Sequence, residues 1–251
     1  MSVRSLCRPF LPDAYGPPPT PFNAPDAAAA GRRRWKDAVA LVCVLATAFL
    51  NLSDAAAGEA RLLMLGDSIT AGFGLAPEDG LVAQLRLRLQ ADGIDAVVLD
   101  GGVSGDTAAG GLARLDWMLG DRPSHAVVAL GGNDALRGLD PAETEAALAA
   151  ILDRLAKEGI PVLLAGMKAP RNLGRAYVEA FDSLYPRLAA RYGVVFYPFL
   201  LEGVAAEPTL NQPDGIHPNA KGAAAVAARL TPYVARLLAL SSGHPGASGR
   251  E

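Results

Sequence analysis

Short apolar runs alternate with longer amphipathic stretches between residues 61 and 240. Each run has four or five residues, is rich in Val, Leu or Ile, and lacks polar alternation. Such runs are typical of parallel strands that are covered on both faces. They predict five strands, at residues 62–65, 96–99, 126–130, 161–165 and 194–197.

Stretches with helical periodicity separate these strands. They predict helices at residues 81–91, 108–119, 141–158, 177–192 and 220–240. A strand–helix alternation of this kind indicates an α/β protein with a doubly wound parallel sheet. Ligands of such sheets bind outside the carboxyl ends of the strands, so the residues that follow each strand are the candidates for function.

The first 57 residues have a different pattern. A basic cluster at residues 32–36 precedes an apolar run at 38–52, and small residues follow up to Ala57. This order predicts a secretory leader (1–57), a folded domain (58–240) and a flexible tail rich in Gly and Ser (241–251). The apolar run is shorter than the ~20 residues of a membrane span. A cleaved signal and a periplasmic or secreted protein are therefore favoured over the alternative, a permanent anchor.

Composition narrows the chemistry of the exported part. Both cysteines, Cys7 and Cys43, precede the predicted cleavage site, which excludes disulfides and cysteine catalysis after cleavage. Six of the 23 basic and four of the 26 acidic side chains lie before residue 58. The rest of the chain therefore has a net charge near −5. Nucleic acid and anionic membranes are therefore not expected partners.

A serine follows the first predicted strand. The apolar run ends at Gly66-Asp67-Ser68, and a helix-compatible segment comes next. A serine at such a junction exposes its hydroxyl at the sheet edge, close to backbone N–H groups that can meet negative charge. Ser68 is therefore a candidate nucleophile, and the alternative is a helix cap.

A serine needs a base, and the chain has three histidines. His125 precedes a predicted strand, at the edge opposite Ser68, and is expected to be structural. His244 lies in the tail, which leaves His217 as the base. Asp214, three residues earlier, can fix the imidazole tautomer as the acid of a triad does. The alternative is a surface turn, since Asp-Gly and His-Pro are turn-forming pairs.

Acyl transfer also requires donors for an oxyanion. Gly105 follows the second predicted strand and offers an unobstructed N–H, and Asn133 follows the third and offers an amide. Together with the N–H of Ser68 they form a candidate oxyanion hole. The alternatives are a turn glycine and an asparagine that caps its own loop.

The stretches SGDTAAGGLARL, LGGNDALRG and DGIHPNAKG, together with GDS at 66–68, resemble the SGNH branch of the GDSL hydrolases. The resemblance extends over residues 61–240 and includes APRNLGRAY at 169–177. Within the family the chain is similar to bacterial periplasmic enzymes with thioesterase, arylesterase and lysophospholipase activities. The resemblance implies a three-layer α/β/α sandwich with a flavodoxin-like sheet, and hydrolysis of esters and thioesters without a cofactor or metal.

The expected function is that of a serine esterase acting as a monomer on small acyl esters or thioesters. Leu136, Leu139, Pro170 and Leu173 are candidates for an apolar acyl groove, and ordinary loop packing is the alternative. Two other functions are open: a carbohydrate O-deacetylase with the same triad, and a non-catalytic acyl or lipid carrier.

Overall fold

The computed structural model describes residues 59–240. The predicted secretory leader and its cleavage site, both cysteines, His244 and the predicted tail lie outside these residues. Five strands form a single parallel sheet in the order β2-β1-β3-β4-β5. The strands are β1 (Ala60–Gly66), β2 (Ala96–Gly102), β3 (His125–Ala129), β4 (Val162–Ala165) and β5 (Val195–Tyr197).

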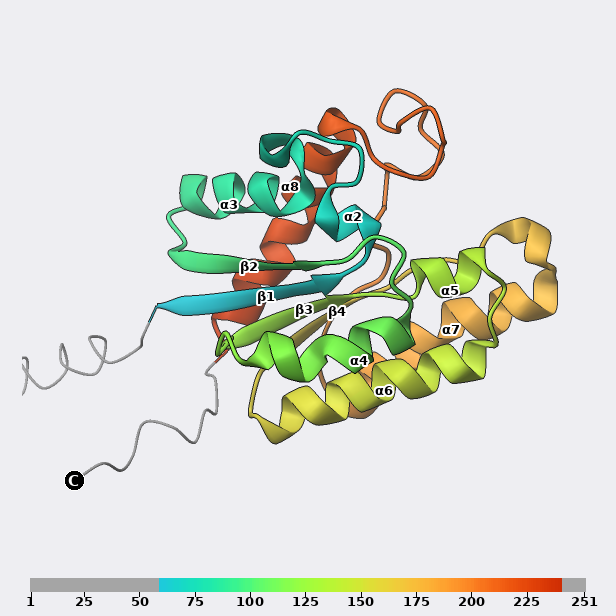
Figure 1. Ribbon diagram of the computed structural model, residues 1–251, viewed down its shortest axis with the longest axis horizontal. Coiled ribbons are helices and arrows are strands. Elements are labelled where there is room, and N and C mark those ends of the chain that lie inside the picture. Colours follow the sequence, from blue (N-terminus) through green and yellow to red (C-terminus); the bar gives the residue numbers. More distant parts are fainter. Residues whose placement is uncertain (1–58, 241–251) are drawn as a thin grey trace, which may run out of the picture. The chain divides into compact units, whose positions relative to one another are not determined.

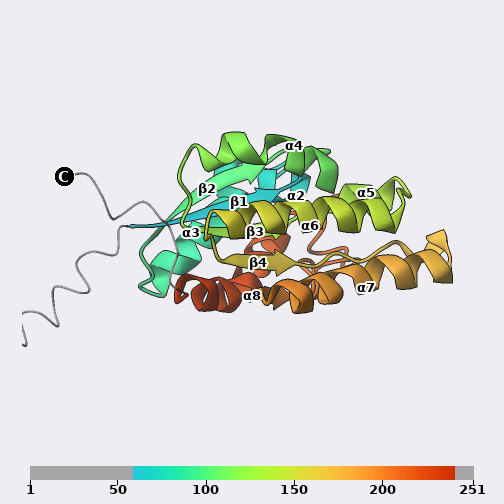
Figure 2. The same cartoon turned by 90° about the horizontal axis from the view of Figure 1, so that it is seen from below.

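Helices cover both faces of the sheet and complete three layers (Figures 1 and 2). α3 (Leu81–Ala91) and α8 (Ala220–Leu238) pack together on one face. On the other face α6 (Pro141–Lys157) packs between α4 (Ala108–Leu119) and α7 (Arg175–Tyr192). The predicted parallel α/β/α sandwich is therefore confirmed.

The core lies where the sheet meets these helices. The apolar residues of β1 and β3 are almost completely buried, in agreement with strands that contact helices on both sides. Both bounds of each of the five predicted helices lie within two residues of the observed bounds. Among residues 59–240, no helix is long and apolar enough to cross a bilayer.

Four further elements were not among the five predicted helices, although a helix-compatible segment was expected after Ser68. They are α2 (Ser68–Ala71), the 3₁₀ turn η1 (Pro77–Asp79), α5 (Gly132–Leu136) and the 3₁₀ turn η2 (Arg171–Leu173). Each has three to five residues, too few for a helical period to appear in the sequence. α2 and α5 begin within three residues of the ends of β1 and β3, so they lie at the carboxyl edge of the sheet.

Candidate active site

Ser68 is the first residue of α2, at the end of β1. The preceding residue, Asp67, is the N-cap of this helix, and its Oδ1 accepts the N–H of Ile69 at 3.0 Å. The alternative in which Ser68 caps the helix is therefore wrong, because Asp67 does so. The Ser68 side chain is left free to contact residues from other parts of the chain.

His217 contacts Ser68 across 149 residues of sequence. Its Nε2 lies 2.9 Å from the Ser68 Oγ, and its Nδ1 lies 2.7 Å from Oδ2 of Asp214. Gln212 ties the histidine loop to the loop after α2, since its amide donates to the carbonyls of Phe73 (2.7 Å) and Pro218 (3.0 Å). The structure thus brings the three predicted triad residues into one hydrogen-bonded line.

The Asp214 carboxylate is held in its ionised form. Backbone and side-chain hydrogen bonds from His217, and a further one from the N–H of Ile216, lower its pKa to about 2. An ionised Asp214 accepts a proton-bearing Nδ1, which leaves Nε2 of His217 as the acceptor for the Ser68 hydroxyl.

Asn133 lies on α5, which begins after a sharp turn. Gly131 has φ +106°, and a Cβ there would lie 2.1 Å from the Tyr185 hydroxyl, so the turn requires glycine. The next residue after Asn133, buried Asp134, accepts the N–H of Ala108 at 2.9 Å and the hydroxyl of Thr144 at 3.1 Å. These bonds fix α5 to the start of α4 and to α6.

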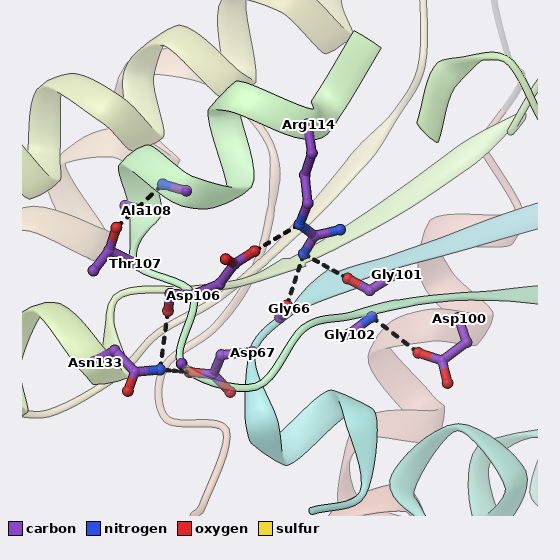
Figure 3. A network of polar contacts seen from close by, with 12 residues as sticks. Gly66, Asp67, Asp100, Gly101, Gly102, Asp106, Thr107, Ala108, Arg114 and Asn133 are labelled. Atoms are coloured by element: carbon purple, nitrogen blue, oxygen red, sulfur yellow. Dashed lines mark hydrogen bonds and ion pairs between the residues drawn. The ribbon is translucent and has the colours of Figure 1, made fainter. Parts of the chain in front are cut away.

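The three predicted oxyanion donors come together at this edge. The Asn133 amide donates to the carbonyl of Asp106 at 2.9 Å, and Oδ2 of Asp67 lies farther off, at 3.5 Å (Figure 3). Gly105 has φ +88°, and its carbonyl accepts Nη2 of Arg137 at 2.8 Å. Within residues 59–240, neither the Gly105 N–H nor the Ser68 N–H donates to a protein acceptor.

Asp67 lies beside these donors and is almost fully buried. Burial raises the pKa of its carboxyl to about 6, although the N–H of Ile69 and the nearby His217 act in the opposite direction. A carboxyl group with a pKa this high, next to a nucleophile, is a feature of functional sites.

An apolar cavity of about 590 Å³ begins at α2 and α5. This volume suits a small-molecule ligand. Of the four candidates for an acyl groove, Leu136 and Pro170 line this cavity, whereas Leu139 and Leu173 are not among its lining residues. Most of the other lining residues are apolar, and two, Lys168 and Arg171, are cationic; the full set is Ile69, Gly132, Met167, Lys168, Ala169, Arg171, Phe199, Leu201, Ala205, Ala206, Gly215 and Ile216.

The remaining histidine of the described chain lies far from Ser68 in the fold. His125 is buried at the start of β3, and its ring nitrogens contact the Ser124 hydroxyl and the Leu240 carbonyl, both at 2.9 Å. This supports the predicted structural role. Residues 59–240 contain no group of three or more side chains arranged to hold a metal ion.

Comparison with known proteins agrees with this geometry. Residues 64–225 match the model of the GDSL-like Lipase/Acylhydrolase family. The chain belongs to this family. Its match includes the end of β1 with Ser68, the loops that carry Gly105 and Asn133, and the His217 loop.

Two curated relatives and a crystal structure show the extent of the similarity. Esterase TesA of Pseudomonas aeruginosa is 44% identical over 172 residues, which cover 68% of this chain and 85% of that protein. The thioesterase 1/protease 1/lysophospholipase L1 of Escherichia coli is 41% identical over 165 residues, 65% and 78% of the two chains. A crystal structure of TesA has a TM-score of 0.68 at 42% identity and covers 70% of this chain and 99% of its own.

Sequence analysis assigned no role to three residues at this GDSL-family site: Asp67, Phe73 and Arg114. Asp67 stands in the GDS motif and Arg114 in the SGDTAAGGLARL stretch, so both were inside recognised motifs. The Phe73 ring lies against the His217 imidazole, with ring centroids 4.6 Å apart. Nothing in the sequence around Phe73 signals this contact.

Proposed function

We propose that this GDSL-family hydrolase cleaves carboxylic esters and thioesters, including aryl esters, acyl thioesters and lysophospholipids, with Ser68 as its nucleophile. The observation that carries this proposal is the hydrogen-bonded line from Asp214 through His217 to Ser68. A serine becomes nucleophilic when a neighbouring base accepts its proton and a third group orients that base. All of these groups come from one chain, which supports activity as a monomer.

The first half of the reaction acylates the serine. Nε2 of His217 takes the Ser68 proton as Oγ attacks the acyl carbonyl. The resulting oxyanion accepts hydrogen bonds from the N–H groups of Ser68 and Gly105 and from the Asn133 amide. His217 then gives its proton to the departing alcohol or thiol, and the acyl group stays on Ser68.

The second half releases the acid. A water molecule occupies the place of the leaving group, and His217 accepts its proton as the water oxygen attacks the acyl carbonyl. The same three donors stabilise the second oxyanion. Collapse of this intermediate breaks the bond to Oγ, and the proton returns from His217 to Ser68.

The cavity lined by Ile69 and Ile216, the sequence neighbours of Ser68 and His217, suits an aliphatic acyl chain better than a sugar. Its walls are mainly apolar, which stabilises each buried methylene by ~0.8 kcal/mol. Phe199 is the aromatic residue among them, and the ammonium group of Lys168 lies over its ring, 4.9 Å from the centroid. That ring face is therefore not free to stack on a carbohydrate, and we favour acyl esters over acetylated sugars.

Active-site labelling tests the assignment. A fluorophosphonate probe is expected to label Ser68 stoichiometrically, and Ser68→Ala should abolish both labelling and turnover of p-nitrophenyl esters while the fold is retained. Ser183→Ala removes a half-buried hydroxyl of α7 that bonds within its own helix, and this matched control should remain active. Labelling of any other serine, or turnover by Ser68→Ala, would refute the assignment of Ser68 as the nucleophile.

We also propose that residues 1–57 are an export signal, that residues 58–240 form the hydrolase domain, and that the protein acts in the periplasm or outside the cell. The basic cluster, the apolar run and the small residues before Ala57 support this. The intact mass of the exported protein should correspond to cleavage near Ala57. Retention of Cys43 would indicate an uncleaved anchor.

A further inference from the structure

Arg114 lies in the middle of α4, and its guanidinium reaches the carboxyl ends of two strands. Nε contacts Oδ2 of Asp106 at 2.6 Å. Nη2 donates to the carbonyls of Gly66 at 2.9 Å and Gly101 at 2.7 Å (Figure 3). The side chains of the Arg114–Asp106 pair are 19% and 17% exposed, so this is a largely buried ion pair.

Each acceptor of Arg114 belongs to a segment that carries one oxyanion donor. Gly66 ends β1, two residues before Ser68, and Gly101 lies in β2, four residues before Gly105. Asp106 follows Gly105 directly, and its carbonyl accepts the Asn133 amide at 2.9 Å. The guanidinium thus binds two of the donor segments directly, and the Asp106 carbonyl links the third, which carries Asn133, to them.

We infer that Arg114 is a positioning residue that sets the mutual spacing of the three oxyanion donors. This inference rests on the proposed function. Oxyanion donors stabilise a transition state only when they are already aimed at the place where charge develops. The Ser68 and Gly105 donors lie on separate strand ends, and the Asn133 donor lies on a third segment. The contacts of Arg114 hold the first two segments together, and Asp106, which Arg114 binds, holds the third.

Arginine is required here for a geometric reason. Its planar guanidinium presents five N–H donors in a rigid fork, which allows one side chain to bind a carboxylate and two carbonyls together. The lysine ammonium is a compact charge on a flexible stem and cannot reproduce this arrangement. The positive charge also offsets the Asp106 carboxylate, whose negative charge would otherwise oppose an oxyanion close to Asn133.

Loss of a buried ion pair lowers stability whatever its role, so the test needs readouts that stability alone does not change. Arg114→Met is expected to lower kcat by roughly 10- to 100-fold, as misplaced catalytic groups do, with KM within about twofold. The rate constant for fluorophosphonate labelling of Ser68 should fall in parallel, because the phosphoryl oxygen occupies the same hole. Arg114→Lys should restore only part of either rate.

A double-mutant cycle with Asn133→Ala separates positioning from general damage. If Arg114 acts through the oxyanion donors, Arg114→Met should lower kcat less in the Asn133→Ala background than in the wild type. The fold-loss of kcat in that background should be less than about a third of the wild-type fold-loss. If the two residues acted independently, the fold-losses of kcat in the two single variants would multiply in the double variant. Arg154→Met is the matched control: it removes a helix arginine that pairs with Asp116 of α4 at 2.7 Å, and kcat should be unchanged.

Near-normal kcat in Arg114→Met, multiplicative losses in the cycle, or a change confined to KM would overturn the inference. If Arg114→Met does not fold, Asp106→Asn and Arg114→Lys take its place in the same cycle. Turnover by Ser68→Ala would refute the proposed function itself. An inactive Ser68→Ala beside a fully active Arg114→Met would refute only the role of Arg114.

Discussion

The Asp214 carboxylate lies 2.7 Å from Nδ1 of His217 and also accepts the backbone N–H of the same histidine at 3.0 Å. The two contacts hold the imidazole from both its ring and its main chain. The aspartate therefore both selects the tautomer and fixes the direction of the ring.

Asp214→Asn is expected to lower kcat by about 10⁴-fold, because an amide favours the wrong tautomer of the base. The depressed pKa of about 2 means that Asp214 binds its proton less tightly in the folded than in the unfolded state. Its contribution to stability is thus present above about pH 4 and is lost as the pH falls towards 2. Kinetics at pH 7.5 and unfolding between pH 2 and 5 measure the two effects.

Asn133→Ala should lower kcat by about 10²–10³, the loss that follows removal of one oxyanion donor. KM should change less, because the amide acts mainly on the transition state. Asn133→Asp keeps the shape of the side chain and removes its donors, so it should be similarly impaired. Near-normal kcat in both variants would exclude Asn133 from the site.

Leu136 and Leu139 form a matched pair three residues apart. Leu136 lines the apolar cavity, whereas Leu139 lies outside its lining, where its carbonyl accepts the Tyr177 hydroxyl at 2.8 Å. We expect kcat/KM to rise from acetyl to medium-chain esters and Leu136→Asp to reduce the medium-chain rate more than the acetyl rate. Leu139→Asp should leave this ratio unchanged. Equal effects of both substitutions, or a preference for acetylated xylan, would contradict the assignment of the cavity.

Asp67→Asn tests the effect of burial on the carboxyl beside the oxyanion donors. In the wild type, burial raises the pKa of the Asp67 carboxyl from the usual 3.8 to about 6, so the folded protein binds this proton more tightly than the unfolded chain. Stability is therefore expected to fall as the pH rises from about 4 to 6 and to stay lower above that. Asparagine cannot ionise, and it keeps an acceptor for the Ile69 N–H.

The stability gain of Asp67→Asn should be small at pH 4 and reach up to about 3 kcal/mol at pH 7.5. Thermal or urea unfolding at the two pH values measures it. Asp140→Asn is the control, since Asp140 caps α6 through a comparable 2.9 Å bond to Ala142 but is exposed. No gain at pH 7.5 would show that the Asp67 carboxylate is not penalised by burial.

Phe73→Leu should lower kcat roughly two- to fivefold. The imidazole of His217 becomes positively charged during the reaction, and an aromatic face stabilises such a charge by about 0.5–1 kcal/mol at an exposed site. Phe73 is half exposed and its ring lies 4.6 Å from the imidazole, tilted by 37°; leucine keeps the apolar volume without the π-system. Phe73→Tyr should retain the wild-type rate, and equal rates for the leucine and tyrosine variants would exclude this contribution.

Much of the fold was predictable because its signals are local. The bounds of α3 and α4 agree with the prediction at both ends, since the helical pattern that predicted them is a feature of neighbouring residues. The parallel sheet followed from the strand–helix alternation. That topology places the ends of β1 and β3 at one edge, which is why Ser68 and Asn133 could be grouped without coordinates.

What the sequence by itself determined, then, was the order of the elements and the strand ends at which the reactive side chains lie. Only the tertiary structure decided which loop side chains line the cavity, placing Leu136 and Pro170 along it and Leu139 and Leu173 outside. It likewise decided the contact of Arg114 with Gly66, 48 residues away in sequence, and the burial that raises the pKa of Asp67. These properties depend on distances and desolvation between segments that are remote along the chain, and a local pattern carries no information about either.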